Sequence, residues 1–130
     1  MKNLDNLISI VIPTFNAEKS ISNLCKDLFA TLKDCKIQIV IVNDCSNDST
    51  HEKCLDLAKE HSNQIAYIKL SKNVGEHNSV MAGLKYSEGD CVIIMDDDFQ
   101  NPPSEAFRML NFFKSNKFDV VYGNYKKKKT

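Results

Sequence analysis

The sequence has no excess of either charge, no long hydrophobic run and no signal-like start. Lysine plus arginine and aspartate plus glutamate number 17 each, so no overall field would attract nucleic acid or an anionic surface. The longest apolar runs, LISIVI and CVIIM, are far shorter than the roughly 18 residues that span a bilayer, and the N-terminus lacks the order of a signal peptide. We therefore expect a cytoplasmic chain with no nucleic-acid partner.

The cysteine pattern also excludes two classes of site. Five cysteines is an odd number, and they lack both a CxxC pair and the cysteine–histidine spacing of a zinc site. We interpret them as reduced thiols, mostly small core residues, rather than a disulfide framework. They are Cys25, Cys35, Cys45, Cys54 and Cys91.

The chain contains short β-branched runs that alternate with helical patterns. With 130 residues, 42% of them hydrophobic, it is long enough for one domain with a core. Alternation of this kind predicts an α/β fold: a mostly parallel sheet of about five strands with helices on both faces. The predicted strands are 7–13, 36–44, 64–70, 90–96 and 118–123, and the predicted helices are 17–34, 49–62, 76–87 and 102–116.

Polar residues collect where these strands end. Parallel sheets bind ligands at the carboxyl ends of their strands, where successive loops leave a crevice. The segments there read PTFNAE, NDCSNDST, SKNVGEHNS, DDDFQNPP and GNYKKKK, and two of them are acidic. We expect the functional site at this edge, with its electrostatics set locally.

The segment DDDFQNPP favours a metal site. Asp96, Asp98 and Gln100 are two residues apart, so their side chains leave on the same side if the chain stays extended. Two carboxylates about 6 Å apart repel by roughly 3 kcal/mol at an effective dielectric near 20. A divalent cation reverses that repulsion, and these oxygens suit Mg²⁺ or Mn²⁺, with positions left for phosphate oxygens. Asp97 by itself is better interpreted as a solvated or helix-capping turn residue.

Two other strand ends add candidates. Asp44 follows a buried strand, where its carboxylate would accept hydrogen bonds from a base N–H or ribose hydroxyls. Asp48 is either a ligand or, with Ser49, the cap of the next helix. The first strand end offers backbone groups at Thr14 and either the ring of Phe15 or the carboxylate of Glu18, although a lone phenylalanine is more often a core residue.

Taken together, these segments resemble family 2 glycosyltransferases of the GT-A fold, which use nucleotide-diphosphate sugars. VIPTFNAEKSI is similar to their first strand and turn, IVNDCSNDST to their DDGSxDGT segment, and DDDFQNPP to the DADLQxPP form of their DxD motif. That form, with NVGEHNSVMAGLKYSEGD before it and DVVYGNYK after it, most resembles the branch that glycosylates polyprenyl phosphates. The resemblance covers essentially the whole chain.

The resemblance implies a Rossmann-like, donor-binding half of a GT-A fold. The donor would be a UDP- or GDP-sugar, the cofactor Mg²⁺ or Mn²⁺, the reaction inverting, and the acceptor a lipid phosphate or a growing cell-surface glycan. Pro13, Phe15 and Asp44 would hold the base and ribose, with Val42 lining the base pocket, and Asp96, Asp98 and Gln100 would coordinate the metal on the diphosphate. The implied donor-binding set is Pro13, Thr14, Phe15, Val42, Asp44, Asp96, Asp97 and Asp98.

Several positions depart from the family pattern. Glu18 is one place beyond the usual glutamate, and Asn43 stands where the first aspartate of a pair is common. Where the polyprenyl branch has an arginine after the last strand, this chain has Tyr125, and only Lys126 approximates the charge. His77, at a predicted helix N-terminus, would either face an anion or remain a surface or capping residue.

Family members continue for about another hundred residues past the last predicted strand. We therefore expect residues 1–130 to be the donor-binding N-terminal part, with the acceptor-binding part and the catalytic region absent, and with full-length protein at the cytoplasmic face of a membrane. One alternative is a catalytically inactive nucleotide-binding fragment. Another is a non-enzymatic, doubly wound binding module such as a phospho-receiver, which the first strand end PTFN disfavours because a receiver needs an acidic pair there.

Overall fold

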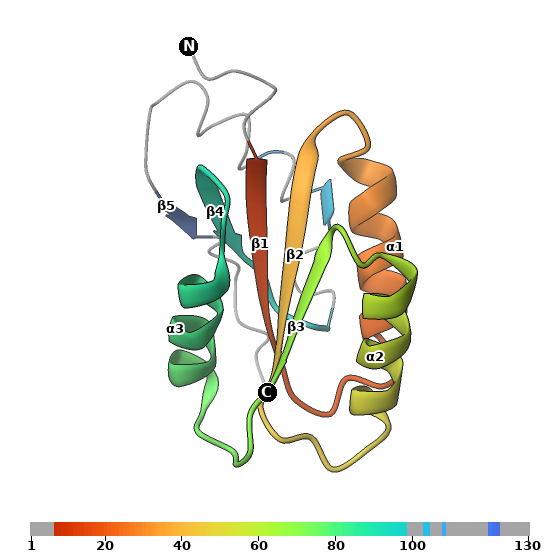
Figure 1. Cartoon of the computed structure of the whole chain (residues 1–130), viewed down its shortest axis with the longest axis vertical. Coiled ribbons are helices and arrows are strands. Elements are labelled where there is room, and N and C mark those ends of the chain that lie inside the picture. Colours follow the sequence, from red (N-terminus) through yellow and green to blue (C-terminus); the bar gives the residue numbers. More distant parts are fainter. Residues whose placement is uncertain (1–6, 99–102, 105–107, 109–119, 123–130) are drawn as a thin grey trace, which may run out of the picture.

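The computed structural model describes residues 7–98, 103–104, 108 and 120–122, and Figure 1 shows their arrangement. The predicted α/β class is confirmed. In chain order the elements are β1 Leu7–Thr14, α1 Ile21–Thr31, β2 Lys36–Asn43, α2 Thr50–Glu60, β3 Ile65–Lys69, α3 Glu76–Tyr86, β4 Cys91–Ile94 and β5 Val120–Tyr122.

The strands form one five-stranded sheet in the order β3-β2-β1-β4-β5, and every neighbouring pair is parallel. From β1 the chain proceeds outward through β2 to β3, then returns to place β4 on the other side of β1. Such a reversal opens a crevice between the loops at the carboxyl ends of the two central strands. The fold therefore positions a ligand site beside the ends of β1 and β4.

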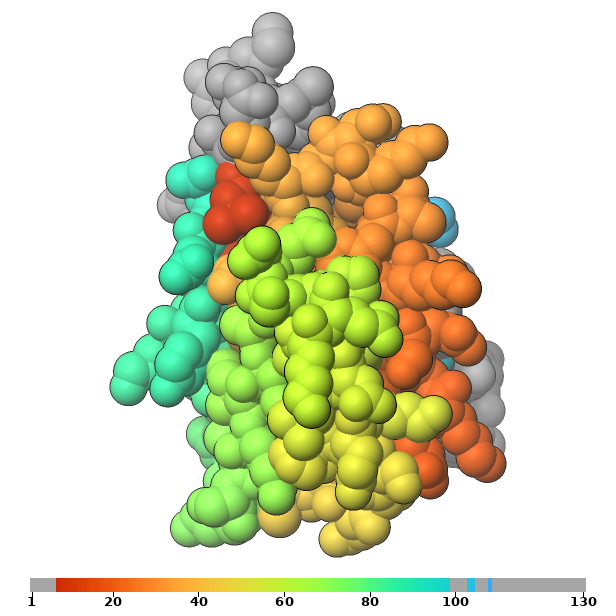
Figure 2. Space-filling view, turned by 45° about the vertical axis from the view of Figure 1, so that its right-hand side comes forward, coloured from red at the N-terminus to blue at the C-terminus, as the bar shows by residue number. Residues whose placement is uncertain are grey.

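Helices cover both faces of this sheet, as predicted. In Figure 1, α1 and α2 lie on one face and α3 on the other, and Figure 2 shows α1 and α2 side by side. Alternate β1 residues point to opposite faces: Ile10 and Ile12 join the core under α1 and α2, whereas Val11 joins the core under α3. Burial on both faces explains why the strand sequences are nearly continuous apolar runs.

α3 lies very close to the sheet at Gly83. A Cβ atom at that position would lie 2.5 Å from Val11 Cγ1 and 3.0 Å from Val42 Cγ2, so any larger residue would require these buried valine side chains to shift. The close approach fixes how α3 sits over β1 and β2, and thereby where its first turn lies.

The predicted helices were too long at their ends. α1 begins at Ile21 rather than residue 17, and the N–H groups of Ala17 and Glu18 instead donate to Thr50 at the start of α2 and to Asp48 in the loop before it. Of the predicted helix 102–116, Pro103, Ser104 and Arg108 are helical, and its remaining residues lie outside the described part.

All five cysteines are free thiols, and Cys25, Cys54 and Cys91 are buried. Burial raises the pKa of the Cys25 thiol to about 12, and burial together with Cys25 and Asp48 does the same for Cys54. Among the described residues, no helix has the length and apolar character needed to cross a bilayer.

Candidate functional site

A cleft of about 170 Å³ lies at the carboxyl edge of the sheet, where the ends of β1 and β2 meet the first turn of α3 and the loop after β4. Three of its lining residues are carboxylates, and none is basic. The lining residues are Pro13, Thr14, Phe15, Asp44, Glu76, Ser79 and Asp97.

Asp44 joins β2 to the start of α3. Its side chain is 4% exposed, and its two carboxylate oxygens accept hydrogen bonds from the backbone N–H groups of Val74 at 2.7 Å and Gly75 at 2.9 Å. Gly75 has a φ of +93°, a conformation that non-glycine residues rarely adopt. The backbone thus supplies hydrogen-bond donors for a buried carboxylate that also lines the cleft.

Asp97 joins the loop after β4 to the end of β1. Its Oδ2 accepts a hydrogen bond from the Phe15 N–H at 2.9 Å, while its carbonyl accepts one from the Ser20 hydroxyl at 2.6 Å. Burial, together with the neighbouring charges of Asp98 and Asp96, raises the pKa of Asp97 to about 6 despite the Phe15 hydrogen bond. The carboxylate is therefore held at a cleft whose described lining residues include no basic side chain.

Asp96 presents a buried oxygen without a partner. Among the described residues, its Oδ2 is the buried side-chain oxygen that accepts no hydrogen bond. Buried polar atoms are normally paired, so an unpaired carboxylate oxygen fits the role of a cation ligand. Within the described residues no three histidine, cysteine or acidic side chains form a complete metal cluster.

The expected geometry of the acidic segment changes after Asp96. The chain turns at Asp97 and Asp98 instead of staying extended, so the two-residue spacing does not by itself place Asp98 beside Asp96. Asp98 is exposed, and Gln100 lies outside the described residues. The ligand set Asp96, Asp98 and Gln100 therefore stays a prediction. Asp97, which the residue pattern favoured as a turn residue and the family resemblance placed in the donor-binding set, lines the cleft.

The other predicted donor-binding residues are distributed as follows. Pro13 and Thr14 line the cleft and are buried, and the Phe15 ring is 44% exposed at its mouth. Val42 is fully buried in the core under α3 and is not a lining residue, because β2 turns that side chain toward the helix. Glu18 is half-buried outside the lining set.

His77 is exposed on the first turn of α3 and does not line the cleft. Lys126 lies outside the described residues. Glu76 and Ser79, which sequence reasoning did not single out, do line the cleft. Both lie near the start of α3, directly after Gly75, and their spacing of three residues puts them on the same face of the helix.

The two loops beside the cleft are tied together. The Asp48 carboxylate accepts hydrogen bonds from the N–H and hydroxyl of Thr50 and from the N–H of Glu18. Although desolvation raises the pKa of Asp48, these hydrogen bonds hold it below its usual range. Ser49 occupies the N-cap position of α2 but makes no side-chain cap bond, so of the two predicted caps Asp48 is the one bonded to the helix start.

A larger hollow of about 760 Å³ lies between α1 and α2. It is lined mostly by polar and charged helix side chains such as Lys26, Lys53 and Asp56, and none of the cleft residues contributes to it. It has no cluster of converging, unpaired groups, so the smaller cleft is the better candidate site.

Residues 9–130 match the sequence model of a family described as glycosyl transferase family 2. An undecaprenyl-phosphate 4-deoxy-4-formamido-L-arabinose transferase of Proteus mirabilis is 36% identical over 121 residues, covering 89% of this chain and 36% of that protein. A protein of the same name from Pectobacterium atrosepticum is 36% identical over 118 residues, covering 88% and 35%. The chain thus spans about a third of the length of these curated relatives.

Solved structures show the same architecture. The S. aureus protein TarS, residues 1–349 in complex with UDP, matches with a TM-score of 0.64 and 26% identity, over 85% of this chain and 32% of that chain. The mannosyltransferase PcManGT of Pyrobaculum calidifontis, in complex with GDP-Man and Mn²⁺, matches with a TM-score of 0.64 over 72% of this chain and 28% of that chain, but at 18% identity it supports the fold alone.

Replacing Asp44 with asparagine tests the clamp at the start of α3. The amide nitrogen of Asp44→Asn would face a backbone N–H, which leaves Val74 or Gly75 without an acceptor. We expect a loss of about 2 kcal/mol in unfolding free energy by urea titration, and faster hydrogen exchange at that amide. Asp56→Asn, on the exposed surface of α2, is the matched control and should change stability by less than about 0.5 kcal/mol. Equal effects of both variants would contradict the clamp.

Replacing Asp97 with asparagine tests the cost of its buried charge in metal-free protein. Its pKa rises from 3.8 in the unfolded chain to about 6 in the fold, so the carboxylate destabilises the fold as pH rises through that interval. Asp97→Asn retains an acceptor for the Phe15 N–H without the charge. Its stability relative to the parent should grow between pH 4 and pH 6 to about 1 kcal/mol, less than the full shift implies because the side chain is partly exposed.

The measurement is urea unfolding in EDTA across this pH range, with the exposed Asp27→Asn on α1 as control. A stability difference that does not vary with pH would show that the Asp97 charge is not destabilised by its surroundings.

Proposed function

The chain belongs to glycosyl transferase family 2, and on that basis we propose that its cleft binds the nucleoside part of a nucleotide-diphosphate sugar while the carboxylates after β4 hold a divalent cation on the diphosphate. The observation that carries the proposal is the buried, unpaired Oδ2 of Asp96 beside the charge-destabilised Asp97. The complexes of TarS with UDP-GlcNAc and with UDP support the same class of ligand.

Charge favours one orientation of the donor. Asp44, Glu76 and Asp97 line the cleft without a basic residue, so a diphosphate inside it would be repelled. A base and a ribose are uncharged and offer N–H and O–H donors to these acceptors. The nucleoside therefore fits the side formed by β1, β2 and α3, and the diphosphate fits the β4 side, where Asp96 lies.

Asp96 would hold the cation through its unpaired oxygen, and Asp98 and Gln100 would complete the protein ligands. When bound, a divalent ion neutralises negative charge that develops on the departing nucleoside diphosphate. Such an ion would also offset the repulsion among the three adjacent aspartates. The residues present therefore fit Mg²⁺ or Mn²⁺.

The chain's own residues position the donor. Asp97 holds the Phe15 backbone, and so fixes the turn whose ring stands at the cleft mouth. Asp44 holds the first turn of α3 in place while offering its free lone pairs to the nucleoside. Neither residue needs to transfer a proton in this role. This suits a reaction in which an anionic acceptor attacks the anomeric carbon directly.

For the whole protein we also propose a sugar acceptor. The curated relatives are named as transferases acting with undecaprenyl phosphate. We extend this to an inverting transfer of a sugar to a polyprenyl phosphate, whose phosphate oxygen is already anionic and requires little general-base help.

Thermal unfolding with UDP or GDP tests the proposal. With Mn²⁺ and nucleotide at a hundredfold excess over the dissociation constant, the parent chain should be stabilised by about 2.7 kcal/mol, and EDTA should remove most of that gain. Asp96→Asn should lose the Mn²⁺-dependent part because the amide is a weaker ligand than a carboxylate, while the control Asp27→Asn should keep it. Stabilisation of Asp96→Asn equal to that of the parent would contradict the metal assignment, and no stabilisation of the parent by either nucleotide would contradict the function.

A further inference from the structure

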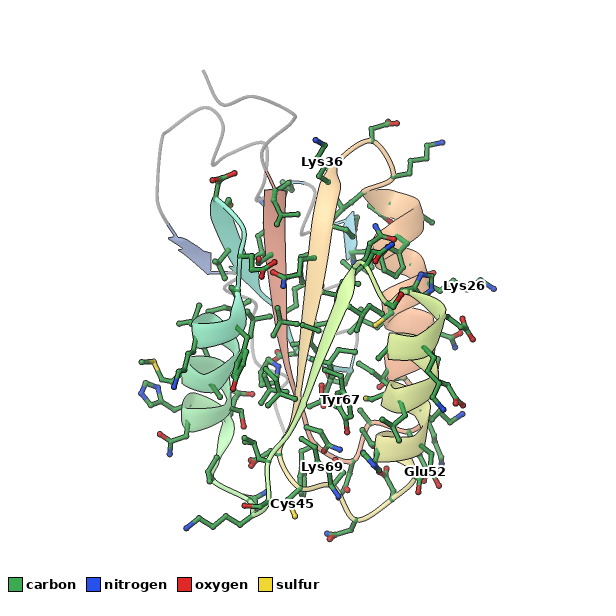
Figure 3. The ribbon with its side chains drawn as sticks, viewed as in Figure 1. Lys26, Lys36, Cys45, Glu52, Tyr67 and Lys69 are labelled. Atoms are coloured by element: carbon green, nitrogen blue, oxygen red, sulfur yellow. The ribbon has the colours of Figure 1, made fainter. Side chains whose placement is uncertain are left out.

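Beside the cleft, a chain of hydrogen bonds links α2, β3, β2 and both loops at the carboxyl edge. It runs from His51 through Tyr67, Asn43 and Ser46 to Asn16, and Figure 3 shows Tyr67 on β3 near this edge. His51, Tyr67 and Ser46 do not line the cleft. This chain of hydrogen bonds ends at Asn16, the neighbour of Phe15 in the sequence, and Phe15 lines the cleft.

A backbone group fixes the direction of the hydrogen bonds that Asn43 makes. The N–H of Ser46 can only donate, so the atom of Asn43 that lies 3.0 Å from it is the carbonyl oxygen Oδ1. The amide nitrogen Nδ2 of Asn43 consequently donates to the Tyr67 hydroxyl at 2.9 Å. The Tyr67 hydroxyl keeps its own hydrogen, and we expect it to donate to His51 Nδ1, 2.8 Å away, with the proton of a neutral His51 ring on Nε2.

The other end of the chain reaches the first strand. The Ser46 hydroxyl donates to Asn43 Oδ1 at 2.6 Å and accepts the N–H of Asn16 at 2.9 Å. Asn16 has a φ of +51°, an uncommon conformation for a non-glycine residue, so this turn depends on external hydrogen bonds. Its Oδ1 also accepts the N–H of Asn47 at 2.8 Å, which joins the same two loops a second time.

Asparagine at position 43 is essential to this arrangement. Asn43 is fully buried and uses its amide as acceptor toward Ser46 and donor toward Tyr67 at once. An aspartate at this position has no donor and would reverse the bond to Tyr67. Aspartate is common at this position in the family. Tyr67 and His51 are therefore partners that suit the asparagine found here.

We propose that His51, Tyr67 and Asn43 are positioning residues that set the Phe15 side of the donor cleft through Ser46 and Asn16. This inference rests on the proposed function for its consequence, which is that donor affinity depends on an intact hydrogen-bond chain. None of the three residues lines the cleft, so each acts on the donor through the two loops.

Tyr67→Phe tests the proposal, because it removes one hydroxyl and leaves the ring. The substitution leaves the buried Asn43 Nδ2 donor without an acceptor and removes the hydroxyl that bonds to His51. We expect the dissociation constant for UDP or GDP with Mn²⁺ to rise about fivefold by calorimetry, as the loss of one buried hydrogen bond implies. Tyr86→Phe is the matched control, since the Tyr86 side chain is 53% exposed on α3 and should leave the dissociation constant unchanged.

A spectroscopic readout separates positioning from a general loss of stability. In the parent, the ¹⁵N shift of His51 Nδ1 should be that of a hydrogen-bonded acceptor nitrogen. Tyr67→Phe should move this shift toward that of an unbonded acceptor and speed hydrogen exchange at the Asn16 amide. Unchanged affinity in Tyr67→Phe with a parent that binds nucleotide would overturn the proposal, as would an unchanged Nδ1 shift together with unchanged Asn16 exchange. If the parent binds neither nucleotide, the proposed function fails, while the Nδ1 shift and Asn16 exchange still decide whether these hydrogen bonds position the turn.

Discussion

The carboxylate of Asp44 on the N–H groups of Val74 and Gly75 is the interaction on which the candidate site depends. α3 connects β3, at one edge of the sheet, to β4 on the far side of β1, and so crosses over β2 and β1. The clamp fixes where that crossing starts, and Gly83 fixes how closely the helix then lies on β1 and β2. Between these two points the first turn of α3 becomes a wall of the cleft.

Unbalanced negative charge is the second constraint. The whole chain has equal numbers of acidic and basic residues, yet the cleft is lined by three carboxylates and no cation. Backbone N–H groups donate two hydrogen bonds to Asp44 and one to Asp97, while, in the described part of the chain, one oxygen of Asp96 is buried without a hydrogen-bond partner. An arrangement that leaves one acceptor unpaired is stable when a ligand supplies the missing charge, and this is why we interpret the edge as a binding site rather than a set of turns.

Much of the fold could be predicted because apolar runs mark the strands and strand ends mark the site. Asp44, Phe15 and Asp97 were all placed at the correct edge on this ground. The sequence could not reveal that Asp97 would bond the Phe15 N–H, since that depends on a turn immediately after Asp96. Nor could it reveal Glu76 and Ser79 in the cleft, because their position depends on the left-handed conformation of Gly75 and the close packing of α3. Local pattern predicts which residues end a strand, whereas side-chain partners depend on loops from distant parts of the chain.

The central claim is that the carboxylates after β4 hold a cation beside the cleft, and paramagnetic broadening of amide NMR signals by Mn²⁺ in the presence of UDP or GDP tests it most directly. The account predicts that signals of Phe15, Ser20 and Asp97 at the carboxyl edge broaden first, while those of Leu7 and Asp90, which meet at the opposite end of the sheet, persist. Broadening that is uniform over the chain, or strongest at Leu7 and Asp90, would contradict it.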